Sequence, residues 1–199
     1  LDLKIAVQYQ LKGDGMGRGL PQNVSQIVEQ FTEVLVESKP DLVVVQGDTT
    51  TAFASALAAF YARIPVAHIE AGLRTGSLEA PWPEEAHRCM IDRLATYFFA
   101  PTERAKERLL LEGISSEKVW VVGNTSIDAI RLALNQSPKS LKKSPSRKIV
   151  VTVHRRENHG KQLEDICCAM RCLAQQFPDI RIVFLLHPNP NIRGPVINM

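Results

Sequence analysis

Residues 41–88 decide the fold, and they read DLVVVQGDTTTAFASALAAFYARIPVAHIEAGLRTGSLEAPWPEEAHR. Residues 42–45 and 64–69 form two runs that are almost entirely apolar, and a helical pattern rich in alanine separates them. Apolar runs without alternation are typical of parallel strands that are buried on both faces. We therefore predict an α/β fold in which parallel strands alternate with helices.

Three carboxylates stand at successive junctions of this pattern. Asp48 follows the first run, Glu70 ends the second, and Glu84 opens the next helix, with Arg88 four residues later on the same helix face. Ligands of a parallel sheet bind beyond the carboxyl ends of its strands, so we expect the three carboxylates to meet there. The simpler alternatives are an N-cap role for Asp48, stabilising by about 1 kcal/mol, and a helix-dipole interaction for Glu84.

The same stretch predicts which nearby side chains are buried. Ala86, Met90 and Leu94 recur at a helical spacing, which predicts an apolar stripe that packs inward. His68 lies within the second run and is expected to be a packed strand residue rather than a catalyst.

The remaining pattern continues as strand, helix, strand, and it is interrupted once. Residues 137–148 (SPKSLKKSPSRK) lack an apolar period and predict a linker. We predict a first Rossmann-like, doubly wound half over residues 1–136 that lacks its opening strand–helix units, and the start of a second half over residues 149–199. The expected strands of these halves are 42–46, 65–70, 97–100, 118–122, 149–153 and 180–186.

Composition restricts the class of protein. Of the 199 residues, 45% are apolar, which is enough to fill a core. Lys and Arg number 24 against 21 for Asp and Glu, a surplus too small to indicate a nucleic-acid or membrane partner. No spanning helix or secretory signal is evident, and the four cysteines have no metal-binding spacing. We expect a cytoplasmic protein that uses no metal or cofactor.

Basic residues follow the two strands of the second half. His154 and Arg155 come after one strand, and His187 comes after the other. We expect them to face the carboxylates of the first half across a cleft. The alternative is a surface Arg–Glu pair together with a turn histidine.

Six ordered motifs extend over nearly the whole chain and support a family resemblance. They are GDTT from residue 47, HIEAGLRT from 68, PWPEEAHR from 81, GNTSIDA from 123, VTVHRREN from 151 and HPNPNIR from 187. This set resembles the non-hydrolysing UDP-N-acetylglucosamine 2-epimerases. The resemblance implies a two-domain architecture of the glycosyltransferase-B type, incomplete at both ends here, with the active site between two Rossmann-like halves. Gln46 is a departure, because many members have His there.

The resemblance also implies a reaction, its ligands and its residues. The reaction interconverts UDP-N-acetylglucosamine and UDP-N-acetylmannosamine by elimination and re-addition of UDP, for cell-surface polysaccharide synthesis. UDP-N-acetylglucosamine is the implied substrate and a second, activating ligand, and the complete protein is expected to be a homodimer. The implied catalytic residues are Asp48, Glu70, Glu84 and His154. The implied substrate-binding residues are Arg88, Arg155 and His187.

The sequence leaves three hypotheses about function open. The leading one is an epimerase fragment that is inactive alone. The second is a hydrolysing relative that releases free N-acetylmannosamine. The third is a non-catalytic module that binds UDP-sugars, although three negative charges in the cleft do not help to bind an anionic ligand.

Overall fold

The computed structural model describes residues 6–11, 19–136, 146–153, 158–186 and 190–197. The chain divides into two compact units, Leu1–Ser137 and Pro138–Met199. Within the described ranges, no helix is long and apolar enough to cross a membrane.

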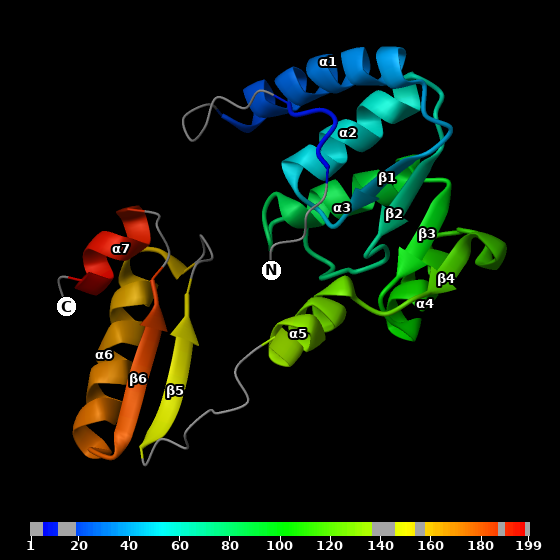
Figure 1. Ribbon diagram of the computed structural model, residues 1–199. Helices are drawn as coiled ribbons and strands as arrows, with labels where there is room; N and C mark the ends of the chain where they lie inside the picture. Colours follow the sequence, from blue (N-terminus) through cyan, green and yellow to red (C-terminus); the bar gives the residue numbers. More distant parts are fainter. Residues whose placement is uncertain (1–5, 12–18, 137–145, 154–157, 187–189, 198–199) are drawn as a thin grey trace. The chain divides into compact units, whose positions relative to one another are not determined.

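The first unit is built on a four-stranded parallel sheet (Figure 1). The strands lie in chain order, without reversal among those described: β1 (Val43–Gln46), β2 (Val66–Ile69), β3 (Tyr97–Ala100) and β4 (Val119–Val121). All three neighbouring pairs are parallel, which confirms the predicted α/β fold with a parallel sheet. The carboxyl ends of the four strands therefore lie at one edge.

Helices precede, connect and follow these strands in the described part of the first unit, and the last helix is exposed along its whole length. They are α1 (Leu20–Ser38), α2 (Thr50–Tyr61), α3 (Glu84–Leu94), α4 (Glu103–Leu111) and α5 (Thr125–Gln136), with a 3₁₀ turn at Ser116–Lys118. Helix α2 lies beside α1 and packs on β1 (Figure 1). Its side chains Ala56, Ala58 and Ala59 are completely buried. Their small size allows close packing of the helix, and they belong to the same core cluster as Val45.

Helix α3 buries only part of the stripe that periodicity predicts, with Leu94 packed against the core. The predicted apolar stripe is wrong at Met90, which is 41% exposed. The buried residues of this helix are Glu85, His87, Ile91 and Asp92. Charged groups are buried in proteins when hydrogen bonds and opposite charges replace their water, and both acids have such partners.

The described part of the second unit contains a two-stranded parallel sheet and two α-helices. Its elements are β5 (Arg147–Thr152), α6 (Lys161–Gln176), β6 (Ile180–Leu185) and α7 (Pro190–Ile197). Strand β5 begins two residues before the expected strand, because Arg147 and Lys148 are exposed and need no apolar character to pair with β6. The core consists of Val153, Leu163, Cys167 and Ile192.

Gly72 provides a test of the packing in the first unit, because a methyl group at this residue has no room. The residue has φ +83°, and a Cβ would lie 2.3 Å from the carbonyl oxygen of Ala105. Gly76 has nearly the same φ, +86°, but a Cβ there would have nothing within 4 Å. We expect Gly76→Ala to cost about 1–2 kcal/mol from backbone strain alone. Gly72→Ala should cost roughly 1–3 kcal/mol more through the steric clash.

Urea unfolding of both variants measures the difference, with Gly76→Ala as the matched control. Equal loss of stability in the two variants would contradict the close approach of residues 72 and 105.

Candidate active site

The turn after β1 presents Asp48 to an arginine of α3. Its Oδ2 accepts a hydrogen bond from Nη2 of Arg88 at 2.5 Å, and Asp48 is half-buried. The N-cap of α2 is Thr49, whose hydroxyl oxygen accepts from the amide of Ala52 at 3.1 Å. The helix-capping alternative for Asp48 is therefore wrong. Its carboxylate instead takes part in an ion pair at the edge of the sheet.

Glu70 lies directly beside this turn. Gly47 donates its backbone amide to the carbonyl of Ile69 at 3.0 Å, and a Cβ on Gly47 would lie 3.8 Å from Oε2 of Glu70. The other carboxylate oxygen of Glu70 accepts from Nδ2 of Asn124 at 3.1 Å. The structure thus brings together the junctions that carry Asp48 and Glu70, as the sequence predicts.

Glu70 also adopts an unusual backbone conformation. Its φ is +72°, in the left-handed region that favours glycine. A residue with a side chain is strained there, by about 1–3 kcal/mol, unless the surroundings hold it in place. The contacts of its carboxylate and of the neighbouring turns supply that restraint.

The start of α5 completes this edge through Asn124 and Thr125, and neither was predicted as a site residue. Asn124 donates from Nδ2 to Glu70, and its Oδ1 accepts a hydrogen bond from the backbone amide of Ser126 at 2.8 Å. The second bond orients the side chain of Asn124. Thr125 accepts from Nε2 of Gln46 at 2.9 Å, so the residue that departs from the family pattern joins β1 to α5. A signal was present, because GNT follows β4 just as GDT follows β1.

Glu84 and its neighbour Glu85 have different surroundings. Glu84 is the first residue of α3, half-buried, and makes no hydrogen bond or ion pair within the described part of the chain. Glu85 is 1% exposed, and its Oε1 accepts from the amides of Thr75 at 2.8 Å and Gly76 at 3.2 Å. Its Oε2 lies 3.4 Å from Nη1 of Arg88. Glu85 thus fixes the loop before α3, while no described contact joins Glu84 to the other two carboxylates.

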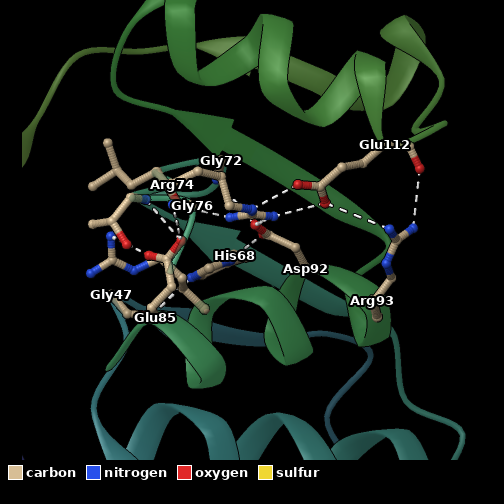
Figure 2. A network of polar contacts seen from close by, with 12 residues as sticks. Gly47, His68, Gly72, Arg74, Gly76, Glu85, Asp92, Arg93 and Glu112 are labelled. Carbon is tan, nitrogen blue, oxygen red and sulfur yellow. Dashed lines mark hydrogen bonds and ion pairs between the residues drawn. The ribbon is translucent and has the colours of Figure 1, made fainter. Parts of the chain in front are cut away.

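Behind the edge lies a buried network of charged side chains (Figure 2). His68 is completely buried, as expected for a packed strand residue, and contacts Asp92 at 2.6 Å. Asp92 pairs with Arg74 at 2.8 Å, and Arg74 forms two hydrogen bonds with Glu112, at 2.7 and 2.9 Å. Burial alone would lower the pKa of Arg74, but Glu112 and Asp92 raise it above its ordinary value.

The predicted residues of the second unit cannot be placed in this site. His154, Arg155 and His187 lie outside the described residues, so their roles stay predictions. In the part of the chain that is described, no group of His, Cys, Asp or Glu side chains is arranged to hold a metal ion. A mainly apolar pocket of about 650 Å³ between α2 and α3 includes Phe53 and Met90 but none of the three carboxylates.

The chain is thus a parallel α/β protein with carboxylates and an arginine at the carboxyl edge of its sheet, the edge at which proteins of this class bind their ligands. The chain matches the UDP-N-acetylglucosamine 2-epimerase family over residues 1–199. It therefore belongs to this family.

Curated relatives share a high sequence identity with the chain. It is 45% identical to the UDP-N-acetylglucosamine 2-epimerase of Escherichia coli K12 over 204 aligned residues, covering 96% of the chain and 54% of the relative. The protein from Neisseria meningitidis serogroup A is 44% identical, with 97% and 55% covered. The chain thus spans about half the length of these relatives.

Solved structures show the same fold. The crystal structure of UDP-GlcNAc 2-epimerase from Neisseria meningitidis bound to UDP-GlcNAc has a TM-score of 0.91 at 43% identity, with 98% of this chain and 55% of that chain covered. The enzyme from Methanocaldococcus jannaschii, in complex with UDP-GlcNAc and UDP, has a TM-score of 0.78 at 35% identity, with 92% and 51% covered. The parallel α/β fold therefore matches about half of an epimerase structure.

The strain at Glu70 predicts an unusual order of stability. Glu70→Ala and Glu70→Gly both remove the carboxylate and its bond to Asn124. Glycine avoids the left-handed penalty of about 1–2 kcal/mol, but it makes the unfolded chain more flexible by roughly 0.4–1 kcal/mol. We expect Glu70→Gly to be more stable than Glu70→Ala by about 0.5–1 kcal/mol.

Urea unfolding of the two variants measures this order. The reverse order, with alanine more stable, would show that the backbone at residue 70 is not held at positive φ.

Proposed function

We propose that this chain provides the acid–base half of an active site that interconverts UDP-N-acetylglucosamine and UDP-N-acetylmannosamine. The observation that carries the proposal is the meeting of the Asp48 and Glu70 turns at the carboxyl edge of the sheet. The 45% identity to the Escherichia coli epimerase supports the choice of substrate, as does the UDP-GlcNAc bound to the Neisseria meningitidis enzyme.

The chemistry explains why several carboxylates are needed. The hydrogen on the second sugar carbon is not beside a carbonyl, so a base removes it at a useful rate only if UDP leaves from the first carbon. Abstraction places the electron pair in a double bond between the two carbons while the bond to UDP breaks. Re-addition returns a proton to the opposite face of the sugar and UDP to the first carbon. A base on one face and an acid on the other are therefore required.

Asp48, Glu70 and Glu84 are the proposed acid–base set. The hydrogen bond from Asn124 orients Glu70, and the hydrogen bond from Arg88 orients Asp48. Glu84 opens α3 without a described partner, which leaves its carboxylate free to meet a ligand. In this proposal Arg88 binds substrate while it also holds Asp48, because a guanidinium has five N–H donors in a fixed fork.

The rest of the proposal concerns the whole protein. His154 joins the catalytic set, and Arg155 and His187 hold the diphosphate side of the substrate or a second, activating UDP-N-acetylglucosamine. We further propose two Rossmann-like halves, residues 1–136 and 149–199, of a glycosyltransferase-B-type architecture, and a homodimer of the complete protein. The four free cysteines fit a reducing, cytoplasmic compartment.

A chimera tests the activity, because it supplies the length that the relatives have beyond this chain. Residues 1–199 replace the aligned segment of the Escherichia coli enzyme, and the protein is incubated with UDP-N-acetylglucosamine in D₂O. We expect UDP-N-acetylmannosamine to form, with deuterium at the second carbon. Glu70→Gln should slow this exchange by about 10²- to 10⁴-fold, the usual contribution of a positioned acid or base.

Glu107→Gln is the matched control, since Glu107 is exposed on α4. Nuclear magnetic resonance of the products and circular dichroism of each protein separate lost chemistry from lost folding. A folded chimera that neither exchanges the hydrogen nor makes product would refute the proposal. Release of free N-acetylmannosamine alone would indicate the hydrolysing reaction instead.

A further inference from the structure

His68 contacts both sides of the site from within the core. Its Nε2 lies 2.9 Å from the carbonyl oxygen of Gly47, which directly precedes Asp48. Its Nδ1 lies 2.6 Å from Oδ1 of Asp92 (Figure 2). Both partners are acceptors here, so both contacts are hydrogen bonds at once only when each ring nitrogen carries a hydrogen. The imidazole thus connects the turn after β1 to helix α3.

Asp92 extends this connection to the turn after β2. Its Oδ2 accepts the backbone amide of Gly72 at 3.2 Å, two residues after Glu70, and also pairs with Arg74. Gly72 cannot retreat, because it packs against the backbone of Ala105. The buried pair of His68 and Asp92 therefore contacts both turns that carry the proposed catalytic carboxylates.

We infer that His68 and Asp92 are positioning residues that fix the Asp48 and Glu70 turns relative to each other for proton transfer. The inference rests on the proposed function. Neither residue is required to touch the substrate, since His68 is completely buried and Asp92 is 2% exposed. Displacement of reacting groups by about 1 Å can cost 10²-fold in rate, so the loss of this connection should act on turnover.

The network offers a matched control at its outer end. Glu112 pairs with Arg74 and Arg93 but contacts neither turn. Asp92→Asn and Glu112→Gln each convert an acid of the same network into its amide. Asp92 is the more buried of the two acids, so its change costs more stability in any case. A positioning pair in addition loosens the two turns selectively when Asp92 is changed, which a purely stabilising network does not.

The experiment measures kcat, KM and amide hydrogen exchange in the chimera described above, carrying Asp92→Asn, His68→Gln or Glu112→Gln. For Asp92→Asn and His68→Gln we expect kcat to fall on the order of 10²-fold. KM should stay within about threefold, because ligand-contacting groups are retained. Amides of residues 47–49 and 70–72 should exchange faster in these two variants. Glu112→Gln should keep kcat within about threefold and leave those amides unchanged.

Equal loss of kcat in Asp92→Asn and Glu112→Gln would overturn the inference, and so would unchanged exchange at the two turns in a folded Asp92→Asn protein. If the unsubstituted chimera folds but does not turn over, the proposed function fails. The exchange measurement still decides whether the pair holds the two turns.

Discussion

Burial of the Asp92 carboxylate is the constraint on which the first unit depends. An isolated carboxylate in a core is strongly unfavourable, so partners have to surround it. They come from β2, through His68, from the turn that follows it, through Gly72, and from the loop beyond that turn, through Arg74. These bonds join α3 to β2 and to the segment that follows it. Because α3 also carries Arg88 and Glu84, the same constraint places the arginine that holds Asp48.

The strands could be predicted from the sequence because their signal is hydrophobic. Strand β2 is buried along most of its length, whereas β1 is buried only at alternate residues, so the expected burial on both faces is wrong at Val44, which is 55% exposed. Both strands nevertheless begin and end within one residue of the expected strands. Helix α7 was not predicted, since Pro195 and Gly194 are unfavourable in a helix. Its buried Ile192 provides the tertiary contact that overrides this preference.

The site was predictable to the extent that strand ends determine it. Asp48 and Glu70 stand at carboxyl ends of adjacent parallel strands, so topology alone brings their turns together. The buried face of α3 was predicted only in part: Leu94 packs against the core, but periodicity detects apolar side chains and this face also carries Glu85 and Asp92. Such residues are revealed only by their partners, which come from loops whose conformation has no periodic signal. Asn124 was missed for the same reason.

Two features of this sheet edge are costly for stability, and they lie next to each other. Glu70 holds a left-handed backbone that glycine would adopt without strain. A buried imidazole and carboxylate lie immediately behind it, although apolar residues of similar volume are often at least as stable as buried ion pairs. Neither feature adds apolar contacts of its own, although the two apolar clusters border them at Ala71 and Ile91. Their common location is explained if the positions of two carboxylates, rather than the stability of the fold, determine which residues occupy this edge.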